Sequence, residues 1–147
     1  MSFVTAFTDK FYAVLICKSK SDTEFILETE PRSLGKISAG RQMVEGKINL
    51  VGQVIQNTDE VWNLKTNEKD FENKLHSFDW VDDLAALSSV EARQFAQNWL
   101  FSWMKKYSSG VGPGWTPELT GRRLVRWVHH HLFLTQGCSE KKLKKFN

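Results

Sequence analysis

The stretch "SSVEARQFAQNWLFSWMKKY" (residues 88–107) carries the strongest structural signal in the chain. Ser88 is followed three residues later by Glu91, the capping-box pattern in which a hydroxyl and a carboxylate each satisfy a backbone donor where a helix starts. A helix through this stretch aligns five small or aromatic side chains on one face: Ala92, Ala96, Trp99, Trp103 and Tyr107. The sequence therefore predicts a long helix that packs this stripe into a core.

A second long helix is expected after the glycine-rich breaker "SSGVGPG" (108–114). Thr116 can act as its N-cap, with Pro117 at the first helical position, where a missing N–H costs nothing. Gly137 ends this helix, and residues 139–147 start another that is cut off by the end of the sequence. Helices of similar length joined by short loops indicate a helical-hairpin array.

Residues 67–87 also have helical periodicity, in the adjoining runs "NEKDFENKLHSF" (67–78) and "FDWVDDLAAL" (78–87). Their apolar residues follow helical spacing: Phe71, Leu75, Phe78, Trp80, Val81, Leu84 and Leu87. Because the second run continues the periodicity of the first, we expect helical structure throughout this region.

The part of the chain before residue 57 is less regular. In "GKINLVGQVIQ" (46–56), Ile48, Leu50 and Val54 alternate with small or polar residues, which predicts a short extended segment, such as a small hairpin. The first segment, residues 3–18, fits an amphipathic helix, although it also suits a buried strand. Its apolar positions are Phe3, Phe7, Phe11, Val14 and Leu15. Pro31 and Gly35 then favour an irregular connection.

Composition and length set limits on the class of protein. A chain of 147 residues has the usual size of one domain, and 41% hydrophobic with 25% charged residues excludes disordered and fibrous classes. Six tryptophans and ten phenylalanines indicate a bulky core more often than a ligand platform. No run approaches the ~20 apolar residues of a membrane span, and no signal peptide is evident. We therefore expect a soluble chain without a membrane span, in a compartment that the sequence does not identify.

Charge is distributed unevenly along the chain. Residues 59–91 contain nine acidic residues and three lysines, whereas residues 105–147 contain nine basic and two acidic residues. The basic end could attract an anion, or the two regions could attract each other. Cys17 and Cys138 are too few and too far apart for a disulfide framework, so each is expected to be a free thiol or a small buried residue.

The three consecutive histidines at 129–131 do not form a metal-binding pattern. On a helix they spread over about 200°, whereas a metal needs ligands about four residues apart on one face. We therefore expect no metal and no cofactor, and we expect His131 to be a hydrogen-bonded histidine at the edge of the core. The helical wheel places Leu124, Trp127, Val128, His131 and Thr135 on one side, with Val125 and Leu132 at its edge. It places Arg122, Arg126, His129 and Phe133 on the opposite side, flanked by Arg123 and His130.

Arg122, Arg126 and His129 offer donors for a carboxylate, sulfate or phosphate group. The alternative is that the two arginines pair with the acidic residues in the middle of the chain. His76 and Tyr107 could serve as acid and base, but nothing in the sequence places them together. No phosphate-binding loop, nucleophile elbow or metal-spaced cluster is present in the sequence.

Several motifs, taken in order, resemble the amino-terminal helical region of the heparinase II/III-like polysaccharide lyases found in bacteria. In that family a "G.F.L.G" segment precedes a tryptophan, an "LH.F.WL.DL" block and a "W.P...GRR...W" helix. The corresponding segments here are "GKINLVG" (46–52), Trp62, "LHSFDWVDDL" (75–84) and "WTPELTGRRLVRW" (115–127). The resemblance covers residues 38–137, and residues 1–36 match poorly.

The resemblance implies a mainly α fold that forms part of an incomplete (α/α) toroid, whose concave face holds an anionic polysaccharide. Such lyases cleave uronate-containing polymers by β-elimination, with tyrosine and histidine as base and acid. Family members carry those groups on later helices and add a β-sandwich domain. This chain stops before either, so no catalytic residue is carried over. An incomplete toroid is also expected to leave an apolar helix face exposed.

These observations predict a single truncated helical domain over residues 1–147, an amino-terminal lyase fragment that is inactive alone. Its lyase-like region spans residues 38–137, and residues 139–147 begin the cut-off helix. The expected partners are an anionic polysaccharide and a second chain that supplies the missing part of the toroid. Candidate substrate-binding residues are Trp115, Arg122, Arg126 and His129.

Two other functions stay open from the sequence. One is a small basic helical module that binds nucleic acid or another polyanion, although nucleic acid is the less favoured partner. Its candidate contacts are Arg122, Arg126, Lys141, Lys142, Lys144 and Lys145. The other is a helical protein-interaction domain.

Overall fold

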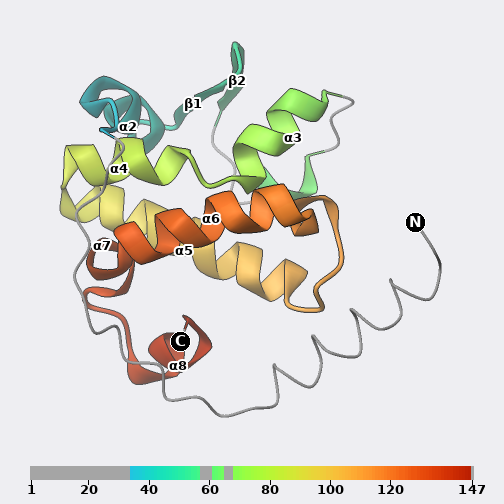
Figure 1. Cartoon of the computed structure of the whole chain (residues 1–147). Helices are drawn as coiled ribbons and strands as arrows, with labels where there is room; N and C mark the ends of the chain where they lie inside the picture. Colours follow the sequence, from blue (N-terminus) through green and yellow to red (C-terminus); the bar gives the residue numbers. More distant parts are fainter. Residues whose placement is uncertain (1–33, 57–60, 65–67, 147) are drawn as a thin grey trace.

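The computed structural model describes residues 34–56, 61–64 and 68–146, and its architecture is mainly helical with one small sheet (Figure 1). The predicted amphipathic segment over residues 3–18 lies outside the described residues. The helices are α2 (Ile37–Val44), α3 (Lys69–His76), α4 (Trp80–Leu87), α5 (Val90–Tyr107), α6 (Pro117–His129), α7 (His131–Thr135) and α8 (Glu140–Phe146). Strands β1 (Lys47–Leu50) and β2 (Gln53–Gln56) and the 3-10 turns η1 (Val61–Asn63) and η2 (Pro113–Trp115) complete the elements.

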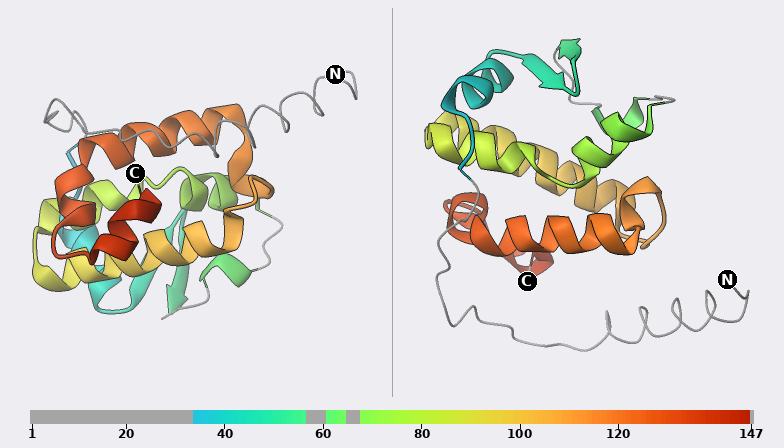
Figure 2. Two further views of the ribbon diagram at one scale, coloured as in Figure 1. Left: turned by 90° about the horizontal axis from the view of Figure 1, so that it is seen from below. Right: turned by 45° about the horizontal axis from the view of Figure 1, so that its top comes forward.

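The two long helices α5 and α6 are joined by residues 108–116 and run roughly antiparallel, as Figure 1 and Figure 2 show. Helix α4 packs on α5, α2 packs on α4, and α7 returns to α5. Along the described ranges, none of the helices has the length and apolar character needed to cross a membrane.

Helix α5 confirms the prediction for residues 90–107, because all five residues of the predicted stripe are buried. The N-cap is Ser89, whose Oγ accepts a hydrogen bond from the backbone N–H of Ala92 at 3.1 Å. Ser88, predicted as the cap, instead adopts a left-handed conformation with φ of 54° and ends α4. The helix therefore begins one residue later than the capping-box pattern suggested.

The predicted helical region 67–87 is interrupted at Phe78. This residue has a φ of 63°, is fully buried, and separates α3 from α4. A left-handed conformation is strained for a bulky residue. It is retained here because the ring packs against the rings of Trp62, Trp80, Trp103 and Trp127, at centroid distances of 5.9, 4.9, 5.6 and 5.4 Å. Packing between distant segments thus overrides local periodicity.

The predicted helix from Thr116 to Gly137 begins as expected, since Thr116 Oγ1 accepts from the Leu119 N–H at 3.2 Å and Pro117 is the first helical residue. It is divided at His130, which has φ of −106° and ψ of 23° between α6 and α7. The imidazole Nε2 of His130 lies 2.7 Å from Oδ1 of the buried Asp82 on α4. This contact anchors the break to the core.

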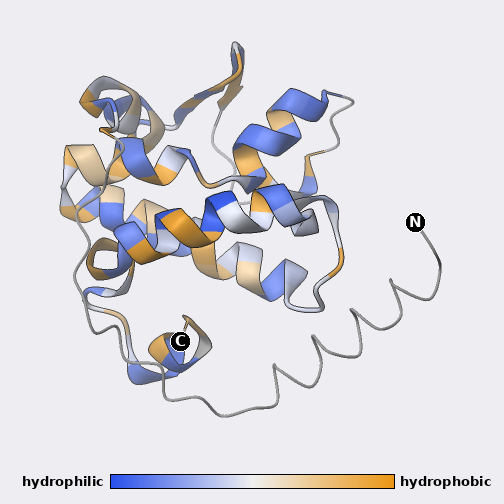
Figure 3. Cartoon of the chain, in the orientation of Figure 1, coloured by the Kyte–Doolittle hydropathy of each residue, from blue (hydrophilic) through white to orange (hydrophobic). Residues whose placement is uncertain are grey.

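The inward face of α6 differs from the predicted one. Leu119 and Arg123 on α6 are buried, and so is His130, which follows it, while Trp127 is half-buried. Four aliphatic residues assigned to the apolar side or its edge are exposed: Leu124, Val125, Val128 and Leu132. Apolar residues along α6 appear as orange segments of its ribbon in Figure 3. The wheel prediction was wrong because it counted Arg123 and His130 as polar surface residues. Inside the protein, Arg123 is satisfied by hydrogen bonds and aromatic rings, and His130 by its contact with Asp82.

The predicted hairpin is present as the antiparallel pair β1–β2, with Ile48 opposite Ile55. Val51 and Gly52 form its turn with φ of 53° and 78°, and positive φ at both central residues matches the right-handed twist of a two-residue hairpin. Val54, expected on the apolar side, is 63% exposed, whereas Ile55 packs against the core. The turn reverses the chain, so the inward face of β2 is set by cross-strand register.

Helix α2 was not predicted, and its packing depends on two glycines. A Cβ at Gly40 would lie 2.3 Å from the backbone oxygen of Asp83, and one at Gly35 would lie 1.9 Å from the backbone oxygen of Asp82. The Lys36 N–H donates to Oδ1 of Asp83 at 2.7 Å, which fixes the start of α2 on α4. The absence of side chains at these two positions permits the close approach of α2 to α4.

We expect Gly40→Ala to lower the free energy of unfolding by about 1–3 kcal/mol, because the added methyl group forces α2 away from a rigid backbone oxygen. Ser38→Ala, at an exposed position on the same helix, is the matched control and should change it by less than about 0.5 kcal/mol. Urea denaturation followed by circular dichroism measures both. Equal stability of the two variants would contradict the proposed close packing.

Candidate functional site

A buried arginine surrounded by tryptophans occupies the space between α5 and α6. Arg123 is 1% exposed, and its guanidinium carbon lies 4.2, 5.0 and 5.6 Å from the ring centroids of Trp103, Trp115 and Trp127. Among the described residues no carboxylate pairs with it. A cation in this position is stabilised by the faces of the rings, an interaction that strengthens when water is excluded.

Backbone and hydroxyl oxygens accept the hydrogen bonds of this guanidinium. Arg123 Nη1 donates to the carbonyl oxygen of Gly114 at 2.8 Å and to that of His76 at 3.4 Å, and Nη2 donates to Oγ1 of Thr120 at 3.4 Å. Burial lowers the pKa of Arg123 to about 10, which still leaves it charged at neutral pH. We call Arg123 and these three tryptophans the arginine cage.

His76 lies beside the arginine cage as a neutral base. Its Nδ1 accepts a hydrogen bond from Trp103 Nε1 at 3.0 Å, so the ring proton resides on Nε2. Burial, and then the positive charges of Arg123 and Lys106, lower the pKa of His76 to about 4. Gly114 packs directly against the ring, because a Cβ there would lie 2.6 Å from Nδ1. His76 is therefore locked in one tautomer and one position.

The structure brings His76 and Tyr107 together, which the sequence could not predict. Their ring centroids are 5.2 Å apart in an edge-on arrangement. Burial, and then the charge of Glu72, raise the pKa of Tyr107, whose hydroxyl donates to the Trp62 carbonyl oxygen at 3.4 Å. Both residues are buried, and each already has a protein partner. In this arrangement the pair supports packing and is closed to a substrate.

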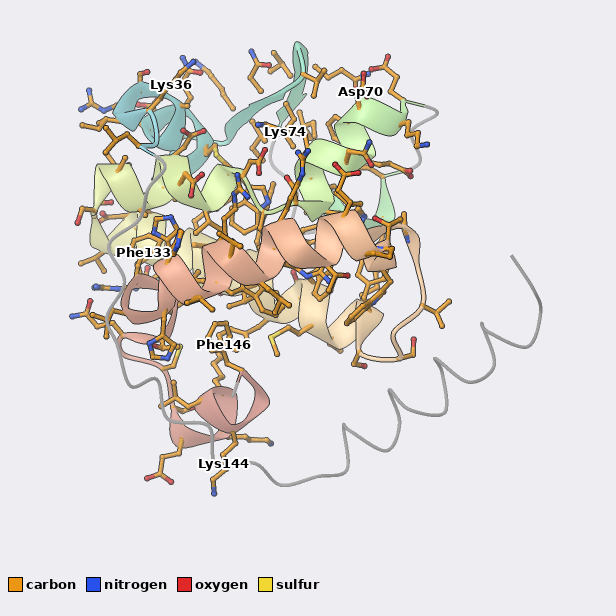
Figure 4. The ribbon with its side chains drawn as sticks, in the orientation of Figure 1. Lys36, Asp70, Lys74, Phe133, Lys144 and Phe146 are labelled. Atoms are coloured by element: carbon orange, nitrogen blue, oxygen red, sulfur yellow. The ribbon has the colours of Figure 1, made fainter. Side chains whose placement is uncertain are left out.

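A network of ion pairs joins the start of α4 to α6. Arg126 Nη2 lies 2.5 Å from Asp79 Oδ1, and its Nε lies 3.4 Å from Asp82 Oδ2. Lys74, labelled in Figure 4, contacts the other oxygen of Asp79 at 2.6 Å. Together with the contact between His130 and Asp82, these pairs hold the carboxyl half of α6 against the break at Phe78.

The four predicted substrate-binding residues do not form one cluster. Trp115 is 38% exposed and donates from Nε1 to the carbonyl oxygen of Tyr107 at 2.9 Å, while its ring covers Arg123. Arg122 is exposed and pairs with Glu118 one turn away at 2.8 Å, and His129 is half-buried. The sequence left open that both arginines pair with the acidic residues 59–91. Arg126 does so through Asp79, whereas Arg122 pairs with Glu118, which lies outside that region.

The remaining histidine and thiol predictions have mixed outcomes. His131, expected at the edge of the core, is half-buried with its ring 5.9 Å from that of Phe146, which projects from α8 toward α6 in Figure 4. Of the three consecutive histidines, the buried one is His130.

Cys138 is a free thiol, and Cys17 lies outside the described residues. Within residues 34–56, 61–64 and 68–146, no three metal-ligating side chains gather at one point.

Sequence reasoning missed Arg123, although a signal for it exists. Trp127 follows Arg123 by four residues, and residues four apart on a helix lie on one face. An arginine with an aromatic residue at this spacing can turn inward. The proximity of Trp103 and Trp115 had no comparable local signal.

Comparison with known proteins finds no matching family model, no matching curated protein and no matching solved structure. The resemblance to polysaccharide lyases therefore rests on the motifs of this chain alone.

The arginine cage predicts different responses at two adjacent arginines. Arg123→Lys should lower the free energy of unfolding by about 2 kcal/mol or more, because an ammonium group replaces neither the planar contact with the rings nor the forked hydrogen bonds. Arg122→Lys, exposed and paired only with Glu118, is the matched control and should change it by less than about 0.5 kcal/mol. Thermal and urea unfolding compare the variants, and similar losses at both positions would contradict the cage.

The depressed pKa of His76 predicts a loss of stability in acid. Between about pH 6.5 and about pH 4 the unfolded chain binds a proton that the folded chain does not. The free energy of unfolding therefore decreases as the pH is lowered through this window. The full effect is on the order of 3 kcal/mol. His76→Asn keeps an acceptor for Trp103 but does not titrate, so its unfolding free energy should fall less between about pH 7 and about pH 4.5. Identical pH dependence in both proteins would rule out a neutral buried His76.

Proposed function

We propose that this chain corresponds to the amino-terminal helical region of a heparinase II/III-like polysaccharide lyase, and that it contributes a wall of an (α/α) toroid. In this role it binds uronate-containing anionic polysaccharide and carries no catalytic group of its own. The remainder of the toroid would be supplied by further helices, on this protein or on a second chain.

The observation that carries the proposal is the convergence of the separate motifs on one aromatic cluster. Phe78 from "LHSFDWVDDL" packs against the isolated Trp62 and against Trp127 from "WTPELTGRRLVRW". The latter motif also supplies Trp115 and Arg123 of the arginine cage. Motif residues that are distant in sequence thus serve one shared packing arrangement, which is what a common fold would require of them.

Three of the four candidate residues reach the surface, since Trp115 and Arg122 are exposed and His129 is half-buried. The pair between Arg122 and Glu118 is solvent-exposed on both sides and therefore weak, so a carboxylate or sulfate group can compete for the guanidinium. Trp115 presents part of its ring, a suitable surface for stacking against a sugar. Arg126 is already neutralised by Asp79 and Asp82, so we assign it a supporting role.

The spacing of these residues favours an extended ligand over a single sugar. Trp115 precedes the first turn of α6, and His129 is its last residue. At the rise of an α-helix they are separated by about 20 Å. A polymer lying along α6 could contact both ends, whereas one monosaccharide could not.

Isothermal titration calorimetry with heparin, polygalacturonate and alginate tests binding, with a neutral glucan as the ligand control. We expect the variant with both Arg122→Ala and His129→Ala to bind the preferred anionic polymer about tenfold or more weakly, as loss of charge-assisted hydrogen bonds requires. Arg41→Ala removes an exposed cation on α2 and should leave the affinity unchanged.

Three outcomes would contradict this proposal. If the chain binds none of the anionic polymers, the proposed polysaccharide binding is wrong. If it binds an unrelated oligonucleotide equally tightly, the result favours a general polyanion-binding module. Release of unsaturated uronate by the chain alone, followed by ultraviolet absorbance, would show that it does carry catalytic groups.

A further inference from the structure

The arginine cage holds a positive charge that pairs with no carboxylate in the described ranges. Carbonyl and hydroxyl oxygens accept the hydrogen bonds of Arg123, so its net charge is not cancelled. The field of such a charge reaches the solvent where the protein that covers it is thinnest. Of the three cage rings, Trp103 is 2% exposed, Trp127 is half-buried and Trp115 is 38% exposed. Trp115 is therefore the ring that separates the buried charge from water.

The indole of Trp115 has one covered side and one open side. The guanidinium carbon of Arg123 lies over the ring at 5.0 Å from its centroid, and Nε1 donates to the carbonyl oxygen of Tyr107 at 2.9 Å. These contacts occupy one face and the nitrogen edge, so the exposed area belongs to the other face and the remaining edge. A ligand that stacks on the open face has the guanidinium on the far side of the indole.

The loop that carries Trp115 is fixed to the protein at two glycines. Gly112 has a φ of 135°, and a Cβ there would lie 2.7 Å from the ring of Tyr107. A Cβ at Gly114 would lie 2.6 Å from the ring of His76. Backbone packed this closely against two buried rings has little room to move. The open face of Trp115 is therefore formed before a ligand arrives, which lowers the entropic cost of binding.

A cation behind an indole changes what its open face attracts. The face of a tryptophan ring is normally negative and attracts positive charge. Arg123 draws this electron density toward itself, and its own charge acts through the dry ring. A sugar stacked about 4 Å above the open face would place a carboxylate roughly 9 Å from the guanidinium carbon, close enough for a significant attraction. The open face thus favours a negatively charged sugar over a neutral sugar of similar shape.

We propose that the open face of Trp115 stacks on one uronate unit, and that Arg123, which touches no ligand, makes this face selective for the charged sugar. The inference rests on the proposed function, because it assumes that the chain binds a uronate polymer. It adds a source of selectivity that is independent of any surface contact with Arg122 or His129. Arg123 acts on the ligand only through Trp115.

Two oligosaccharides separate charge from stacking. Oligogalacturonate and its methyl ester share one backbone, and at about pH 6 the former is ionised whereas the latter is neutral. Calorimetric titration of the full chain gives the ratio of the two affinities. An Arg122→Ala, His129→Ala background removes the surface cations of the proposed site. In this background we expect the charged oligosaccharide to bind about fivefold more tightly than the ester.

Two replacements of Arg123 then identify the origin of this preference. Arg123→Gln keeps amide donors but removes the charge, whereas Arg123→Lys keeps a charge, and both disturb the packing of the cage. A purely structural role would weaken binding of both oligosaccharides equally in both variants. We expect the preference to fall to about one in the Gln variant and to persist in the Lys variant. An unchanged preference in Arg123→Gln, or equal loss in both variants, would overturn the proposal.

Two glycine variants test the preformed loop without altering the cage residues, and they decide the matter if a replacement of Arg123 does not fold. Gly112→Ala forces the loop away from Tyr107, whereas Gly110→Ala, at a φ of 73°, adds a Cβ that meets nothing within 4 Å. We expect Gly112→Ala to weaken binding of oligogalacturonate about fivefold or more and to reduce the preference over the ester. Gly110→Ala should bind like the wild type, and circular dichroism verifies the fold of each variant. Equal affinities of the two glycine variants would contradict a preformed Trp115 face.

The wild-type titration distinguishes this inference from the proposed function. If the wild type binds neither oligosaccharide, the proposed function is wrong and the selectivity of Trp115 is wrong with it. If the wild type binds oligogalacturonate but the preference does not depend on Arg123, only the inference about Trp115 and Arg123 is wrong. Binding through Arg122 and His129 would then stand.

Discussion

The arrangement of this protein depends on the burial of one cation, Arg123, among tryptophan rings. A guanidinium removed from water must keep its hydrogen bonds, and here they go to the carbonyl oxygens of Gly114 and His76. The Gly114 oxygen belongs to the loop before α6, and the His76 oxygen lies at the end of α3. The hydrogen bonds of Arg123 therefore hold both segments in place. Trp103 then links the cage to His76, and Phe78 closes the remaining space. The strained turn at Phe78 therefore packs its ring against two tryptophans of the cage, Trp103 and Trp127.

Helix α6 uses its arginines in three physically different ways within two turns. Arg122 is solvated and weakly paired, Arg123 is buried without a carboxylate partner among the described residues, and Arg126 is neutralised by two aspartates. Identical side chains therefore differ in what they offer a ligand. The positive charge that reaches the surface is smaller than the sequence implies. This is why Arg122, and not Arg126, carries the proposed anion contact.

Features encoded by neighbouring residues could be predicted from the sequence, and features that depend on distant contacts could not. Helix α5, the start of α6 at Thr116 and the β1–β2 hairpin all follow from spacing, capping and turn chemistry within a few residues. The breaks at Phe78 and His130 arise from partners on other elements, so periodicity extends through both. The same limit applies to the site. Trp115 and Arg122 could be proposed individually, but the approach of His76 to Tyr107 requires the tertiary fold.

The aromatic cluster also gives this molecule an optical property. Trp80 and Trp99 meet edge-on at 5.1 Å, and Trp62, Trp103 and Trp127 all surround Phe78. Indoles this close exchange excitation energy, and their transition dipoles couple. The near-ultraviolet circular dichroism and the emission of these tryptophans therefore report on the junction of α3, α4, α5 and α6. Any event that loosens that junction becomes visible without an added label.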